Sequence, residues 1–293
     1  MTAAVDVGFW TGGITYTPAV GAGPATDLEF GAVDANGIGW MLNSFDGMGG
    51  PDTVGQVVQQ AGDHGGWATP QFYGPRVMTL TVTASAPSWA LRDVARATLQ
   101  QAVPVSDLAL LRLDEPVPKQ MLVRRSGGLP EKSLNLTDVQ FSVILVAPDP
   151  RKYGTVLHSL TATQQSIAAG LAPPLTPPIT LPAGFPPMAV ACTNAGSFET
   201  RPVVTIRGPI TGPGVVNQAT GQKVTFSSLT LATSLDVLAV DFLNRQALLN
   251  GAYRTADLSS SWWVLPPGTT TVQVTGTGTT GSQTTVAWRD AWI

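Results

Sequence analysis

Charged side chains are scarce in this sequence, at 12% of 293 residues, compared with about 25% in an average soluble protein. The 16 lysines and arginines are scattered along the chain, and the formal net charge is −3. Binding to a phosphate backbone usually requires basic residues gathered on one face. The sequence therefore argues against nucleic acid binding, and its low charge favours a surface that is largely covered in an assembly.

Cysteine and histidine are also rare. The single cysteine, Cys192, cannot form an internal disulfide, which suits a reducing cytoplasm, and we expect a small buried side chain there. His64 and His158 have no second histidine or cysteine at ligand spacing, which argues against zinc and non-haem iron. Spacing alone leaves a Ser-His-Asp triad open, but the Gly-x-Ser-x-Gly motif is absent. We expect no catalytic residue, no cofactor and no metal.

Long apolar runs are missing as well. Residues 153–198 contain no lysine, arginine, aspartate or glutamate, but they hold seven prolines, and these break up any stretch of the roughly 18 apolar residues that a membrane span needs. The N-terminus lacks the basic, apolar and small-residue segments of an export signal. We expect no membrane insertion, and we expect residues 166–188 to form an extended, proline-rich connector.

The first half of the chain reads mainly as β-structure. Asp34-Ala35-Asn36-Gly37 lies between residues 28–33 and 38–42 and predicts a hairpin, because Asn-Gly favours tight two-residue turns. Residues 77–84 alternate apolar and threonine side chains, as a half-buried strand does. Three further strands are predicted at 108–113, 120–125 and 134–146, with a turn at Gly127-Gly128. Residues 43–74 are predicted as a loop, and a loop of that length is usually functional.

One helix is predicted at 88–102, since apolar residues recur there every three to four positions and Ser88 can cap its first turn. Pro104 ends it.

The second half is organised around residues 194–206, where a glycine-containing turn leads into a β-branched strand. Residues 156–163 are a candidate first strand of this half. Turn signals divide the remainder into short strands, a pattern typical of a β-sandwich. They are Gly212-Pro213-Gly214, Thr220-Gly221, Asn250-Gly251 and Pro266-Pro267-Gly268.

Two further motifs, at residues 276–281 and at Trp262-Trp263, resemble ligand-binding features. Residues 276–281 match the Gly-x-Gly-x-x-Gly dinucleotide pattern, but 282–288 predict a strand where that site needs a helix, so a turn is favoured. Trp262 and Trp263 are predicted in a strand with their rings on opposite sides, one in the core and one exposed or at an interface.

In their order along the chain, a set of landmarks resembles the distal tail proteins of long-tailed bacteriophages, which are Dit-like, siphovirus-type tail components. In the first half these are Gly39-Trp40-Met41-Leu42, Asp46-Gly47, Gly65-Gly66-Trp67, Tyr73-Gly74-Pro75-Arg76 and Asp149-Pro150-Arg151-Lys152-Tyr153. In the second half they are Asn194-Ala195-Gly196-Ser197, Glu199-Thr200-Arg201-Pro202, Asn217-Gln218-Ala219-Thr220-Gly221, Asp241 and the run from Trp263 to Gly268.

The resemblance implies a mainly β protein of two domains. Residues 1–152 would form a β-rich belt domain with the helix, and residues 153–293 a galectin-like β-sandwich entered through the connector. It also implies a non-enzymatic homohexameric ring at the phage tail tip, made in the host cytoplasm and built into the virion. The implied partners are the tail tube, tape measure, tail hub (tail-associated) and receptor-binding proteins.

The same landmarks supply candidate residues. We expect structural anchors at Trp40, Trp67, Arg76, Pro202 and Trp263, and interface residues at Asp46, Gly47, Gly66 and Tyr73. The alternative function is a carbohydrate-binding or adhesion module that contacts the host surface, because a galectin-like sandwich with an exposed tryptophan would serve that purpose. Selective glycan binding by the second half would favour this alternative.

Overall fold

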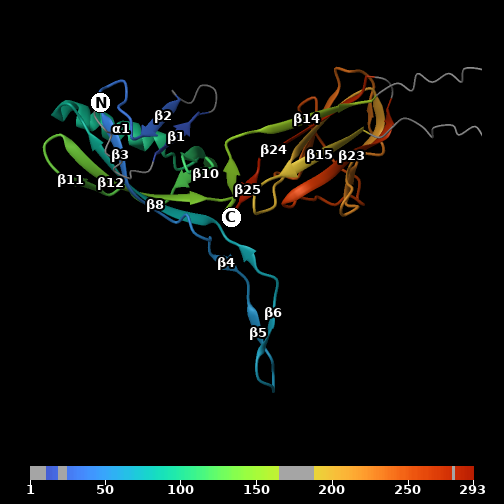
Figure 1. The fold of residues 1–293 in the computed structure, drawn as a ribbon, viewed down its shortest axis with the longest axis horizontal. Coiled ribbons are helices and arrows are strands. Elements are labelled where there is room, and N and C mark those ends of the chain that lie inside the picture. The colour runs from blue at the N-terminus through green and yellow to red at the C-terminus, as the bar shows by residue number, and fades with distance from the viewer. Residues whose placement is uncertain (1–10, 19–24, 165–187, 279–280) are drawn as a thin grey trace, which may run out of the picture. The chain divides into compact units, whose positions relative to one another are not determined.

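The computed structural model describes residues 11–18, 25–164, 188–278 and 281–293. The chain forms two compact units, one of Met1–Thr155 with Ile293 and the other of Val156–Trp292 (Figure 1). The sequence predicted the division three residues earlier, after residue 152. The fold class is mainly β with one described helix, as the sequence predicted.

The main sheet of unit 1 has the strand order β2-β1-β9-β10-β12-β8-β3, and its neighbours are antiparallel. Two short strands, β11 and β13, pair with β12 and β10. The strands are β1 (Gly12–Tyr16), β2 (Thr26–Phe30), β3 (Gly39–Asp46), β8 (Arg76–Ser85), β9 (Ala109–Leu113), β10 (Lys119–Arg125), β11 (Glu131–Ser133), β12 (Asp138–Ala147) and β13 (Lys152–Gly154).

The centre of this sheet is the ladder between β8 and β12, which runs for ten residue pairs from Asp138 opposite Ser85 to Ala147 opposite Arg76. Both strands alternate in burial along their length, because successive side chains of a strand point to opposite faces. The buried set includes Met78, Leu80 and Phe141. These residues belong to one hydrophobic core that draws on β1, β2, β3, β8, β9, β10 and β12.

Helix α1 (Trp89–Ala102) contacts β1, β2 and β8. Its buried residues are Arg92, Ala95, Leu99 and Ala102, so one face at three- to four-residue spacing enters the core. Ser88 occupies the N-cap position, but its side chain makes no capping hydrogen bond.

Two predicted elements of unit 1 differ in detail. The turn at 34–37 forms, but β2 pairs with β1 and β3 pairs with β8, and Val33 and Gly39 form only an isolated bridge. The strand predicted at 134–146 begins at Asp138, because the Asn135 side chain accepts hydrogen bonds from the backbone of Thr137 and Asp138 and turns the chain there.

Residues 51–75 form a two-stranded arm instead of the predicted loop. Strands β4 (Thr53–Val54) and β7 (Phe72–Tyr73) pair, and further out β5 (Val57–Gln59) pairs with β6 (Gly66–Ala68). The chain enters the arm from β3 and returns from it into β8, and Figure 1 shows β4, β5 and β6 along it.

Unit 2 is a sandwich of two antiparallel sheets. One has the order β14-β24-β16-β20-β21-β22, and the other has the order β15-β23-β17-β18, with β19 also paired to β17. The strands of the first are β14 (His158–Thr163), β16 (Val203–Arg207), β20 (Val237–Asp241), β21 (Gln246–Leu249), β22 (Ala252–Arg254) and β24 (Gln283–Trp288). Those of the second are β15 (Met188–Asn194), β17 (Ile210–Asn217), β18 (Lys223–Thr225), β19 (Thr230–Leu231) and β23 (Gly268–Gly278). Unit 2 also contains β25 (Ala291–Trp292).

The two sheets enclose a single hydrophobic core. Val204 and Ile206 enter it from the first sheet, and Val190, Val215 and Val272 enter it from the second. Alternate side chains of each strand point inward and meet in this core. The predicted turn at Gly212-Pro213-Gly214 is instead a bulge inside β17, since the register with β23 shifts between Thr211 and Gly214.

The connector predicted at 166–188 lies outside the described residues except for Met188, which begins β15. The central residues of the Gly-x-Gly-x-x-Gly match, 279–280, are also outside them. A strand, β24, follows this match, as the sequence predicted, so the helix that a dinucleotide site needs is absent there.

Candidate functional site

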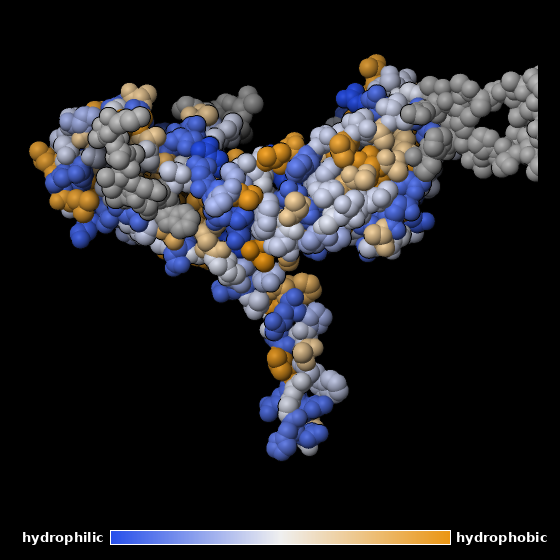
Figure 2. Space-filling view, in the orientation of Figure 1, coloured by the Kyte–Doolittle hydropathy of each residue, from blue (hydrophilic) through white to orange (hydrophobic). Residues whose placement is uncertain are grey.

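The arm of residues 51–75 is an exposed apolar feature of unit 1. All ten residues of its four strands are exposed, and they include Val57 at 66%, Trp67 at 65% and Phe72 at 71% exposure. Figure 2 shows orange, apolar residues along it. A two-stranded ribbon without a packed face is marginally stable by itself in water. Exposed apolar side chains in such an element are typical of a surface that another molecule covers.

The base of the arm is held by Arg76, the first residue of β8. Its side chain is fully buried. Nε donates to the Pro150 carbonyl at 3.1 Å, and Nη1 donates to the carbonyls of Gly47, at 3.0 Å, and of Gly49. The remaining nitrogen, Nη2, is buried and has no hydrogen-bond partner among the described residues. Burial lowers the pKa of Arg76 below its ordinary value.

A second buried cation lies beside it. Lys152 donates from Nζ to the carbonyl of Met48 at 3.1 Å. Burial, followed by the positive charges of Arg76 and Lys119, lowers the pKa of Lys152, and Glu115 acts in the opposite direction. The two cations therefore bind the carbonyls of residues 47, 48 and 49. Sequence spacing does not predict these contacts.

The four predicted interface residues all lie in the arm or at its base. Asp46 is exposed, and its Oδ1 accepts a hydrogen bond from Gly47 N at 2.8 Å. Gly47 has φ +98, and a Cβ there would lie 2.4 Å from the Val77 carbonyl oxygen, so glycine is needed. Gly66 lies opposite Gln59 and Tyr73 lies opposite Thr53 in the arm. Their role as interface residues stays a prediction.

Trp67 was predicted as a structural anchor, and here the structure differs. It lies in β6 directly opposite Val58 and is largely exposed. A two-stranded arm has no interior, so a large ring on it cannot be buried by its own unit.

Trp40 lies in the core of unit 1 and is 2% exposed. Its Nε1 donates to Asp34 Oδ2 at 3.1 Å, while Asp34 Oδ1 accepts from the backbone of Asn36 and Ile38 at 2.8 and 3.0 Å. One carboxylate thus shapes the turn and satisfies the buried indole nitrogen.

Pro202 and Trp263 are buried in unit 2. The Pro202 carbonyl accepts from Phe242 N at 3.2 Å, and the Phe242 ring lies 4.1 Å from that of Trp263. Trp262 and Trp263 were predicted in a strand with opposed rings, but they lie outside the strands and both contact Phe242, Trp262 edge-on at 5.5 Å.

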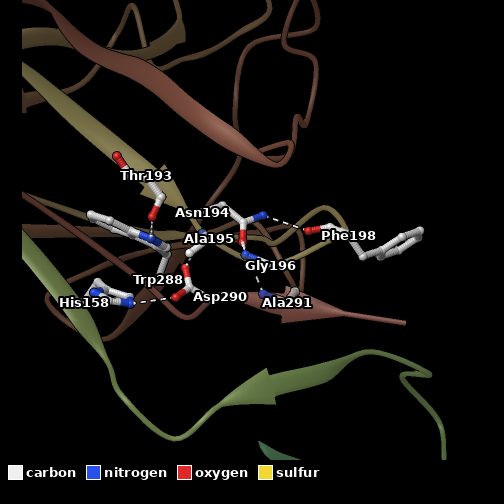
Figure 3. A network of polar contacts seen from close by, with 9 residues as sticks. All are labelled: His158, Thr193, Asn194, Ala195, Gly196, Phe198, Trp288, Asp290 and Ala291. Atoms are coloured by element: carbon white, nitrogen blue, oxygen red, sulfur yellow. Dashed lines mark hydrogen bonds and ion pairs between the residues drawn. The ribbon is translucent and has the colours of Figure 1, made fainter. Parts of the chain in front are cut away.

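Unit 2 also holds a network of polar contacts at one end of its sandwich (Figure 3). Asn194 is buried, its Nδ2 donates to the carbonyls of Phe198 and Leu265, and its Oδ1 accepts from Gly196 N and Ala291 N. The four bonds tie the end of β15 to the start of β25. Sequence analysis predicted Asn194 only as part of a turn and of the landmark Asn194-Ala195-Gly196-Ser197.

Asp290 extends this network to His158. Its Oδ1 accepts from Ala195 N at 2.9 Å, and its Oδ2 lies 3.1 Å from His158 Nε2. The His158 ring stacks on Trp288 at 5.4 Å, and Trp288 Nε1 donates to the Thr193 carbonyl. These groups line a hollow of about 320 Å³. Because the polar atoms named here bind one another, the arrangement is suited to fastening strands together.

Cys192 faces the core of unit 2 and is 1% exposed. Burial raises the pKa of its thiol to about 12. The thiolate is the reactive form, so we expect a thiol reagent such as 5,5′-dithiobis(2-nitrobenzoate) to leave the native protein unmodified at pH 8 and to modify one thiol per chain in denaturant. Fast modification of the native protein would contradict this burial.

The described residues contain no group of three or more metal-binding side chains. Among them, no helix is long and apolar enough to cross a membrane.

A comparison with known protein families gives a match within unit 2. Residues 195–292 match the family described as siphovirus-type tail component, C-terminal domain. No curated protein matches the sequence.

Among solved structures, the Dit protein of phage SPP1 is similar with a TM-score of 0.61 at 15% identity, covering 87% of this chain and 94% of that one. A chain of the phage P2 baseplate, in its activated conformation with Ca, is similar with a TM-score of 0.52 at 9% identity, covering 95% and 97%. The baseplate with Sr gives 0.52 at 10% identity, covering 96% and 98%. At identities this low, the structural similarity establishes the fold alone.

The matched family is one of structural tail components and not of enzymes. The resemblance seen in the sequence is thus confirmed: residues 195–292 match the siphovirus-type tail component family, and the chain has a Dit-like fold.

Proposed function

We propose that the protein is a distal tail protein that closes into a homohexameric ring at the phage tail tip. The observation that carries the proposal is the arm of residues 51–75, which exposes apolar side chains on a Dit-like fold. In a ring with cyclic symmetry, a patch on one copy meets a different patch on the next. An arm that leaves its own unit can supply one side of such a contact.

In this proposal the ring joins the tail tube and tape measure proteins to the tail hub and the receptor-binding proteins. The protein is made in the host cytoplasm and then built into the virion. The low charge of the sequence, 12%, supports a surface that is mostly covered, since the cores of interfaces are depleted in charge.

The carbohydrate-binding alternative rested on an exposed tryptophan in the sandwich. Trp263 and Trp288 are buried there, and Trp262 packs against the core. These three tryptophan rings therefore pack in or against the core of unit 2. Among the described residues, no observation favours sugar binding over assembly. A glycan array with the full chain is the direct test.

Ring formation is tested by the mass of the purified protein in light scattering, where we expect a six-fold multiple of the 30.5 kDa chain. Val58 and Trp67 lie directly opposite each other on the arm. We expect the double change Val58→Ser and Trp67→Ser to weaken assembly by about 30-fold or more, because a tryptophan at the centre of an interface typically contributes 2 kcal/mol or more.

The control is Trp89→Ser, which removes another tryptophan of similar exposure, on helix α1 of the same unit. A monomer at every concentration, without rings in negative-stain images, would contradict the proposal. An equal loss of ring assembly in the arm variant and in the helix variant would show that the arm is not the interface.

A further inference from the structure

Two buried cations bind the point where the chain enters the arm. Arg76 donates hydrogen bonds to the carbonyls of Gly47 and Gly49, and Lys152 donates one to the carbonyl of Met48, which lies between them in the sequence. Three consecutive carbonyl oxygens are thus fixed by two side chains from other parts of unit 1. A segment bound in this way has little freedom to change its backbone direction.

The partners of the two cations are unusual. Neighbouring basic residues are paired with acids, Arg151 with Asp149 and Lys119 with Glu115. Among the described residues, the side chains of Arg76 and Lys152 donate hydrogen bonds to backbone carbonyls alone, and Arg76 Nη2 has no partner. Burying a cation that is not hydrogen-bonded to an acid is unfavourable for stability, and the charge of Glu115 offsets this only in part for Lys152. What the two side chains supply here is geometry, since they fix three consecutive backbone carbonyls.

The location of the pair connects three parts of unit 1. Residues 47–49 follow β3 and lead into the arm, Arg76 is the first residue after the arm, and Pro150 follows β12. The Arg76 side chain therefore ties the outgoing strand, the returning strand and the main sheet to one another. Strands β4 to β7 pair only with each other among the described strands, so the direction of the arm is set at this base.

We propose that Arg76 and Lys152 are positioning residues, which fix the direction in which the arm leaves unit 1 so that successive copies meet in one geometry. The assembly half of this inference rests on the proposed ring, whereas the ordering of the arm does not. The two halves are separable by experiment.

Hydrogen exchange of the full chain tests the ordering of the arm. In Arg76→Met and Lys152→Met we expect the amides of Gly74, which donates to the Asp52 carbonyl, and of Val54 to exchange about tenfold faster or more than in the parent. Light scattering of the same samples should show fewer rings. The matched control is Arg92→Met, since Arg92 is also buried in unit 1 but bonds to Ser133 on β11.

The outcomes are distinct. Unchanged exchange at the arm base in both variants overturns the inference, whatever happens to the rings. Faster exchange with normal ring formation overturns the role in assembly. Equal acceleration in Arg92→Met would mean that any lost buried arginine loosens the arm. Lys152→Met leaves Arg76 in place and keeps the test open if Arg76→Met does not fold. A parent protein that never assembles contradicts the proposed function, and the exchange data alone then decide on the arm.

Discussion

Replacing Trp40 with alanine is expected to lower the free energy of unfolding of unit 1 by about 3–5 kcal/mol, the usual loss for a buried tryptophan. The ring is 2% exposed and belongs to the core of that unit. The change also removes the donor to Asp34, whose carboxylate organises the turn to Ile38. Urea unfolding followed by tryptophan fluorescence and far-UV circular dichroism measures the loss.

The control is Trp67→Ala, a change of identical chemistry at an exposed position. We expect it to alter stability by no more than about 0.5 kcal/mol, as is usual for surface sites. Trp40→Phe should retain more stability than Trp40→Ala, because it keeps most of the ring volume. Equal unfolding midpoints for the two alanine variants would show that Trp40 does not anchor the core.

Gly196→Ala is expected to destabilise unit 2 by about 3 kcal/mol, at the upper end of typical overpacking losses. A Cβ on Gly196 would lie 1.9 Å from the carbonyl oxygen of Ala291 and 2.6 Å from its backbone nitrogen. These are backbone atoms, so no side chain can rotate away. The segment would separate from β25 and break the contacts that Asn194 makes to Gly196 and Ala291.

Differential scanning calorimetry measures this change, and Gly128→Ala is the control. A Cβ on Gly128 meets nothing within 4 Å, so we expect little change in its unfolding. A Gly196→Ala protein as stable as the parent would show that residues 194–198 and β25 are not held this closely.

Regular alternation and helical spacing predicted the long elements well. Residues 77–84 correspond to β8 and residues 88–102 to helix α1, within one residue at each boundary. Both elements bury a continuous face, so the pattern of apolar residues follows from the packing. Trp40, predicted as a structural anchor, lies in such a strand and is buried in the core.

The remaining features lacked such a signal. The arm buries neither face, so its strands, which include Val57–Gln59 and Gly66–Ala68, show no alternation and resembled a loop. The Asn135 side chain competes with the strand through its own hydrogen bonds, which apolar patterning does not report. The Arg76 and Asn194 contacts join residues from several segments, and only the folded chain brings them together.

The contact between His158 and Asp290 also has a consequence for the timing of synthesis. The two residues are separated by 132 positions. Asn194 likewise cannot form its hydrogen bond to Ala291 until that residue has been synthesised. At synthesis rates of roughly 5–20 residues per second, about 7–26 s pass between the appearance of His158 in the first strand of unit 2 and that of its partner Asp290. During this interval β14 lacks its neighbour β24, so the nascent sandwich presents an open strand edge to the ribosome and its chaperones.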